Sequence, residues 1–283
     1  MDLQDGAPSA VERRPSIELA LASKLAVLLQ REVSRLTAPI WMPSAVGALW
    51  LGFGYEVVGM ERLRARYRRL RNQSDAPLLI CANHLTMIDS AIIAWALGSP
   101  GWYLVHYSAI PWNLPERRNF AYSPISEILS YLMKCLPVTR GGERAVVADV
   151  LNRFIYLLSQ GEVGLMFPEG GRSRSGRVEV EAAAPGVGRV VTALPRCRVL
   201  CVYLRGERQK TFGAVPASGE RLHLRMELTE PRSRHSGLRG SRDVAQQIVA
   251  KLAEMERDYF DGRKRRRGSR GPRNRMRSHA SAL

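Results

Sequence analysis

Cysteine is scarce in this chain. Its four cysteines lie at positions 81, 135, 197 and 201, and no two of them form a C-x-x-C pair, which argues against a zinc site. Each lies in an apolar stretch, which favours a reduced, buried thiol and therefore the cytoplasmic side of a membrane. Residues 1–15 are polar and contain acids, so they do not have the pattern of a signal peptide.

Acidic residues are also few relative to basic ones. The 26 acids face 43 lysines and arginines, and the formal net charge is +17. Many of the cations lie in two runs, at residues 62–71 and 263–277. Such runs attract polyanions, either anionic lipid head groups or nucleic acid. The alternative for the second run is a solvated, disordered tail with no dedicated partner. Nucleic acid is disfavoured, because zinc-finger spacing, RNP-like aromatics and a clear helix-turn-helix are all missing.

The segment before residue 56 has two parts. Residues 17–36 place leucines at spacings of three and four, with basic residues on another face, which predicts an amphipathic helix. That composition suits a helix lying in a membrane interface, although a helix packed on the protein's own core has the same pattern. The uncharged run 36–55 is near the length of a membrane span, but its prolines and glycines favour a broken hairpin dipping into one leaflet.

The remainder alternates strand-like and helix-like segments. The expected strands are 77–82, 102–107, 163–167, 199–204 and 222–228, the last alternating like an edge strand. The expected helices are 87–97, 125–135, 144–158, 186–194 and 243–259. This order predicts an α/β fold, with a mixed sheet flanked by helices.

His84 and Asp89 follow the first expected strand. A turn before the helix lets Asp89 face His84, where its carboxylate can fix the imidazole tautomer and make His84 a general base. The alternative is structural. Thr86 and Asp89 fit a capping box, so that Asp89 caps a helix and His84 is an ordinary structural histidine.

Two further segments suit anion binding. In Phe167-Pro168-Glu169-Gly170-Gly171-Arg172-Ser173, paired glycines let backbone N–H groups approach an anion, and the arginine can grip a phosphate. In residues 136–142 an apolar stretch delivers Arg140 into a glycine loop. Each segment alone is equally compatible with an ordinary surface turn.

In this order, the segments resemble the glycerolipid acyltransferase family, which includes the bacterial 1-acylglycerol-3-phosphate acyltransferases. The family's first motif, N-H-x4-D, is met in full by Asn83, His84 and Asp89. The second, an apolar stretch ending in arginine, is met by residues 137–140.

The other two motifs of the family are met less fully. The third, F-P-E-G-T-R-S, matches residues 167–173 except that Gly171 replaces the threonine. The fourth usually contains a Val-Pro pair, which residues 200–202 lack. The resemblance covers roughly residues 57–204.

The resemblance implies acyl transfer from acyl-CoA or acyl-carrier protein to the hydroxyl of a lysophospholipid, most simply 1-acylglycerol-3-phosphate, in phospholipid biosynthesis. His84 would be the base and Asp89 would orient it. The phosphate site would comprise Arg140, Glu169, Gly170, Gly171, Arg172 and Ser173, with Glu169 holding the arginine loop. No metal or bound cofactor is implied. An alternative acceptor, such as a lyso-ornithine lipid, or an inactive scaffold stays open.

The resemblance also suggests a division of the chain. We expect a disordered N-terminus (1–15), a membrane-docking helical segment (16–55), an acyltransferase domain (56–260) and a basic disordered tail (261–283). The expected partners are a phospholipid membrane surface, the lysophospholipid acceptor and the acyl donor. The expected location is the cytoplasmic face of the cell's inner membrane, as a monotopic or peripheral protein.

Overall fold

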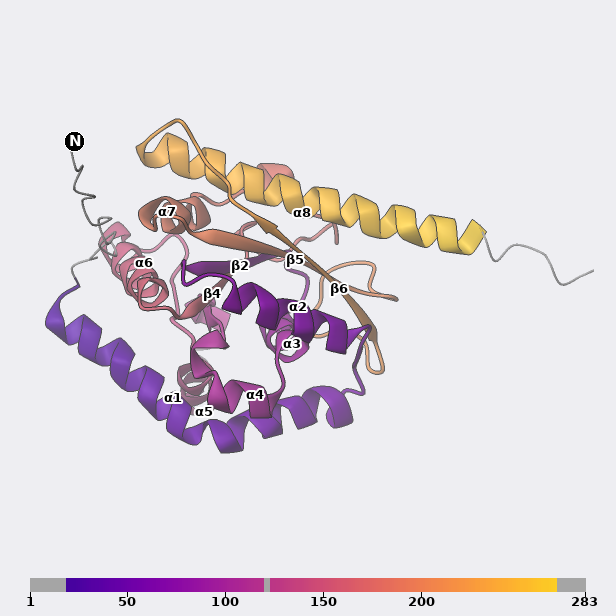
Figure 1. The fold of residues 1–283 in the computed structure, drawn as a ribbon, viewed down its shortest axis with the longest axis horizontal. Helices are drawn as coiled ribbons and strands as arrows, with labels where there is room; N and C mark the ends of the chain where they lie inside the picture. The colour runs from indigo at the N-terminus through magenta and orange to yellow at the C-terminus, as the bar shows by residue number, and fades with distance from the viewer. Residues whose placement is uncertain (1–18, 120–122, 269–283) are drawn as a thin grey trace, which may run out of the picture.

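The computed structural model describes residues 19–119 and 123–268, and its strands form one six-stranded sheet (Figure 1). The order across the sheet is β1-β6-β5-β2-β4-β3. The strands are β1 (Glu56–Val57), β2 (Leu78–Ala82), β3 (Trp112–Asn113), β4 (Val163–Met166), β5 (Arg198–Gly206) and β6 (Arg221–Thr229). Neighbouring strands are parallel except β5 and β6, which are antiparallel, so the sheet is mixed.

Helices connect and cover these strands. The α-helices are α1 (Leu21–Gly47), α2 (Met60–Asn72), α3 (Asp89–Leu97), α4 (Pro100–Val105), α5 (Pro124–Leu132), α6 (Arg144–Ser159), α7 (Pro185–Ala193) and α8 (Gly237–Gly268). Short turns of other helix types are η1 (Ala48–Gly52), η2 (Tyr107–Ala109), η3 (Arg117–Asn119) and η4 (Val180–Ala182). The α/β class and the mixed sheet are therefore confirmed.

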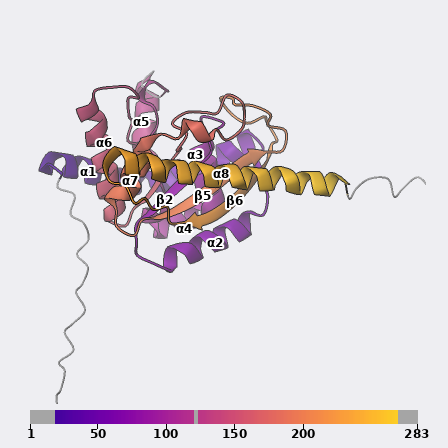
Figure 2. The same cartoon turned by 90° about the horizontal axis from the view of Figure 1, so that it is seen from above.

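The central strand β2 is buried on both faces, as its continuous apolar sequence requires. Leu78 and Ile80 face a core formed with α1 to α4, whereas Leu79 and Cys81 face a second core formed with α6, α7 and α8. Figure 2 shows α2 and α8 on opposite sides of the sheet, with the C-terminal end of α8 extending beyond it. The ends of the parallel strands are thus free to carry loops.

The prediction of a strand at residues 102–107 is wrong. These residues form most of α4 and the start of η2. Pro100 occupies the first turn of α4, and the Ser99 hydroxyl accepts a hydrogen bond from Trp102 N at 3.3 Å. This helix-start signal outweighs the β-propensity of the aromatic and branched residues that follow it.

The prediction of a broken hairpin at residues 36–55 is also wrong. Helix α1 continues through Pro39 and Pro43 and runs on into η1. Residues of its inner face, such as Val27, Ala38 and Met42, are buried along the length of the helix. This packing outweighs the free-energy cost of prolines inside a helix. Within the part of the chain that is described, no helix is both long and apolar enough to cross a membrane.

Two boundaries also differ from the sequence predictions. Strand β6 pairs with β5 on one side and with the two-residue β1 on the other, so it is not the edge strand. Helix α8 continues to Gly268, past the predicted start of a disordered tail at residue 261. The predicted disordered N-terminus and the tail beyond residue 268 lie outside the described residues.

Candidate active site

The site begins where β2 ends. The side chain of Asn83 joins this end to β5, because its Nδ2 donates to Leu204 O at 3.0 Å and its Oδ1 accepts from Leu204 N at 2.7 Å. The next residue, His84, lies in the loop before α3, and Asp89 is the first residue of α3. The Nδ1 of His84 is 3.0 Å from Asp89 Oδ2. The sequence-predicted pair is therefore in direct contact.

Asp89 also organises the loop that carries His84. Its Oδ2 accepts hydrogen bonds from Leu85 N at 2.6 Å and Thr86 N at 2.8 Å, and the Thr86 hydroxyl donates to its Oδ1. The bond to Thr86 N is the one that a capping box would give, and the same carboxylate orients the imidazole. The structural and catalytic interpretations of Asp89 are thus both compatible with one geometry.

Phe167 holds the imidazole from the other side. The two rings stack with centroids 3.9 Å apart and planes 13° from parallel. The His84 side chain is 13% exposed. With Nδ1 turned to Asp89, Nε2 is the nitrogen left to accept a proton. A further link joins the two motifs, because Ser173 N donates to His84 O at 2.9 Å.

Glu169 is buried beneath the loop and does not line the pocket around His84. Its Oε2 accepts from Glu179 N at 3.2 Å. Burial raises the pKa of Glu169 to about 7, against the lowering effect of the backbone amides of Glu179 and His84. Its contacts are those of a residue that holds the loop from 169 to 179.

The other residues of this segment divide between the pocket and its support. Ser173 is buried, and its hydroxyl bonds the backbone of Arg177. Gly170 has φ +68°, which favours glycine. A Cβ at Gly171 would lie 3.6 Å from Arg140 Nη1, so the second and third motifs meet here.

A polar pocket of about 60 Å³ brings three of the predicted residues together. His84, Arg140 and Arg172 all line it. Arg172 Nη1 donates to Gly213 O at 2.8 Å. Arg140 N donates to Glu116 Oε2 at 3.1 Å. Glu116 lies in the pocket wall and has no sequence motif that would have identified it.

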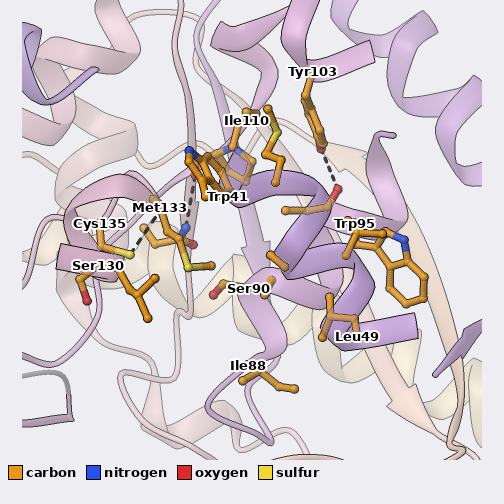
Figure 3. A pocket seen from close by; sticks show the side chains of 18 of the residues that line it. Trp41, Leu49, Ile88, Ser90, Trp95, Tyr103, Ile110, Ser130, Met133 and Cys135 are labelled. Carbon is orange, nitrogen blue, oxygen red and sulfur yellow. Dashed lines mark hydrogen bonds between the residues drawn. The ribbon is translucent and has the colours of Figure 1, made fainter. Parts of the chain in front are cut away.

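An apolar cavity of about 240 Å³ adjoins this pocket (Figure 3). It lies between α1, α3 and α5, with Trp41, Trp95 and Tyr103 in its wall. Both cavities are lined by four residues in common: Met87, Ser90, Asn113 and Cys135. The sequence did not predict the apolar cavity, because its lining residues come from segments that are far apart in the chain.

Metal chemistry has no obvious ligands here. Among residues 19–119 and 123–268, no three histidine, cysteine or acidic side chains gather as a metal site would require. All four cysteines are free thiols.

A histidine–carboxylate pair, two arginines and an adjoining apolar cavity thus lie together near the end of β2. The Acyltransferase family model matches residues 55–216, more than half of the chain, and the chain belongs to this family. It is an acyltransferase, which confirms the resemblance at the level of the family. The match runs from the residue before β1 into the loop after β5, so it includes every motif residue named above. No curated protein sequence matches the chain.

Proposed function

We propose that this acyltransferase moves a fatty acyl group from acyl-CoA or acyl-carrier protein to the hydroxyl of a lysophospholipid, most simply 1-acylglycerol-3-phosphate. The observation that carries the proposal is the junction of two cavities beside His84. One holds Arg140 and Arg172, and the other is apolar. A lysophospholipid phosphate and an acyl chain need these two environments.

His84 is the general base in this reaction. Its Nε2 takes the proton of the acceptor hydroxyl as the oxygen attacks the thioester carbonyl. The C–S bond then breaks, and the proton passes from His84 to the leaving thiolate. Asp89, 3.0 Å from Nδ1, keeps the imidazole oriented and stabilises its protonated form. No acyl-enzyme and no bound cofactor is required.

The two arginines hold the acceptor. Arg140 and Arg172 line the pocket with His84, and a phosphate between them would accept charge-assisted hydrogen bonds. Glu169 and Ser173 support the loop from beneath, since both are buried. The backbone N–H groups of Gly170 and Gly171 are the further candidate donors to the phosphate.

A membrane surface is the proposed source of the acceptor. The outward face of α1 exposes a row of large apolar side chains, Leu21, Leu25, Leu29, Leu36 and Ile40. Its opposite face is buried on the body, so these side chains do not stabilise the fold. An amphipathic helix of this kind lies in a membrane interface, as a monotopic or peripheral attachment. The cytoplasmic face suits the free thiols and the intracellular acyl donors.

Purified enzyme incubated with labelled acyl-CoA or acyl-carrier protein and a panel of lyso-acceptors tests the proposal. We expect labelled diacyl product with lysophosphatidic acid and loss of at least about a hundredfold in kcat on His84→Ala. Transfer only to a different acceptor, such as a lyso-ornithine lipid, would overturn the acceptor assignment. Near-normal turnover of the His84 variant would overturn the mechanism.

Asp89→Asn provides the matched control for the pair. Asparagine can still accept the backbone hydrogen bonds of Leu85 and Thr86, but it cannot stabilise the imidazolium. We expect unfolding midpoints close to wild type and a large loss of kcat. A lower unfolding midpoint with unchanged kcat would leave Asp89 as a structural cap only.

A further inference from the structure

The loop between β5 and β6, residues 207–220, is attached directly to the catalytic loop. Gly213 N donates to Leu85 O at 3.0 Å, and Met87 N donates to Ala214 O at 2.9 Å. Arg172 Nη1 in turn donates to Gly213 O. The β5–β6 loop therefore packs against the loop that carries His84 and against Arg172, and it forms a rim beside their pocket without lining it.

Two large apolar side chains on this rim face solvent. Phe212 is 41% exposed and Val215 is 42% exposed, and the centroid of the Phe212 ring lies 5.6 Å from Arg172 Cζ. Exposed apolar side chains that are grouped beside a binding site indicate a surface that contacts a partner, because exposed groups add little to the stability of the fold.

The β5–β6 loop also forms hydrogen bonds with the segment that follows η1. Tyr55 Oη donates to Pro216 O at 2.8 Å, and Gly219 N donates to Phe53 O at 2.8 Å. Just before Phe53, Trp50 and Leu51 are exposed. The β5–β6 loop is thus joined by hydrogen bonds to the segment that follows η1.

Cations accompany the apolar side chains. Lys210 and Arg174 are exposed, and the Thr211 hydroxyl donates to Arg174 O at 3.0 Å, which keeps the two segments together. The two acids at the ends of the loop are engaged. Glu207 pairs with His223 at 2.8 Å, and Glu220 is buried. Exposed apolar side chains with two cations beside them are suited to an anionic lipid surface.

We propose that the β5–β6 loop is a second membrane contact, inserting Phe212 and Val215 into an anionic leaflet while Lys210 and Arg174 meet its head groups. The inference rests on the proposed membrane attachment through α1 and adds a second contact on another part of the chain. With the loop in contact, the neighbouring His84 loop lies close to the bilayer surface. A lysophospholipid then reaches His84 without crossing water.

Sedimentation with vesicles of equal parts phosphatidylglycerol and phosphatidylcholine tests the proposal on the full chain. We expect Val215→Asp to weaken binding about tenfold, because an apolar insertion is replaced by a charge. Lys210→Ala should weaken it about fivefold, the effect of one cation at an anionic surface. On pure phosphatidylcholine the Lys210 effect should disappear. Transfer between monomeric short-chain substrates should be unchanged in both variants.

The β5–β6 hairpin offers matched controls at its other end. Strand β6 runs antiparallel to β5, so Thr229 pairs near the start of β5, and Leu238 follows it at the beginning of α8. Leu238 is 58% exposed, and Arg242 is exposed one turn later. Leu238→Asp and Arg242→Ala should bind vesicles as wild type does.

The outcomes separate the two proposals. Wild-type protein that does not sediment with vesicles overturns membrane attachment altogether. Wild-type protein that sediments, with Val215→Asp and Lys210→Ala indistinguishable from it, overturns the loop contact and leaves the attachment through α1. Because Lys210 is an exposed side chain, its variant keeps the test decisive even where Val215→Asp fails to fold.

Discussion

Glu169 is a buried acid whose proton is held more tightly in the folded protein than in the unfolded chain. Burial raises its pKa to about 7 from an ordinary value of 4.5. A carboxyl group with a raised pKa contributes stability that is complete below its unfolded pKa and is lost as the pH rises through the folded one. The loop that carries Arg172 is therefore held most firmly at mildly acid pH.

Glu169→Gln should remove this dependence. Glutamine can still accept the hydrogen bond from Glu179 N, and it cannot ionise. We expect the unfolding free energy of wild type, relative to the variant, to fall by about 3 kcal/mol between pH 4.5 and pH 8. Urea unfolding followed by circular dichroism at both pH values measures it. Parallel pH profiles for the two proteins would show that folding does not raise the pKa of Glu169.

At the residue scale, the sequence predicts the motif residues of the site but not the other residues that line its pocket. His84 and Asp89 were predicted from the N-H-x4-D motif together with the order of the segments that follow it, and a turn before α3 brings them to 3.0 Å. Glu116 and Asn113 also line the pocket, but Asn113 reaches it through pairing of β3 with β4 and Glu116 through a bridge to Val138. A tertiary contact of this kind leaves no periodic trace in a sequence, so no motif pointed to them.

Among the elements, α1 is attached to the body by polar as well as apolar contacts. Glu162, just before β4, accepts hydrogen bonds from Arg31 of α1 at 2.7 Å and from Lys134 at 2.6 Å. Trp112 Nε1 donates to it at 2.9 Å. Burial raises the pKa of Glu162, but the two cations more than offset this, and its pKa lies below the ordinary value. Glu162 thus links α1 to two segments of the sheet layer.

Glu162→Gln should be strongly destabilising. It would leave the fully buried Lys134 cation without its counter-charge, and breaking a buried pair in this way costs about 3–5 kcal/mol. Glu61→Gln is the control, because Glu61 pairs with Arg64 at the exposed surface of α2, where such pairs contribute about 0–1 kcal/mol. Chemical unfolding measures both. Equal small effects would mean that water reaches Lys134.

The elements that were predicted wrongly have different causes. The prolines of α1 disfavour the helix that they lie in, whereas the sequence of α4 combines a helix-start signal with residues of high β-propensity. In α1 the burial of Ala38 and Met42 against the core decides the outcome, and in α4 the Ser99 cap does. Strands such as β2, whose sequence and burial agree, were predicted to within a residue of their observed bounds.

At the scale of the whole molecule, the helices on the two faces of the sheet differ in how they pack. The face covered by α1 to α4 contains the apolar cavity and the exposed row of α1. The face covered by α6 to α8 is a closed core that braces the loop from 169 to 179, since Glu256 of α8 accepts from Arg177 Nε at 2.9 Å. On the proposed function, substrate contacts and structural support are thereby separated by the sheet.

The apolar cavity runs along α3, away from the catalytic pocket. Ser90, in the first turn, lines both cavities, whereas Ala94 and Gly98 line only the apolar one. At the rise of an α-helix, Ala94 lies about 6 Å beyond Ser90, so a side chain added there would intrude well inside the cavity. On the proposed function, this depth accommodates the acyl chain.

Ala94→Leu should therefore shift the preferred acyl chain toward shorter ones. The added carbons occupy space that the distal methylenes of a long chain would fill, and each lost methylene contact is worth about tenfold or more in discrimination. We expect kcat/KM for palmitoyl thioesters to fall at least about tenfold relative to octanoyl thioesters. Ala250→Leu, at an exposed position on α8, should leave the ratio unchanged. A constant ratio in the Ala94 variant would place the acyl chain elsewhere, and the cavity beside His84 would then need another occupant.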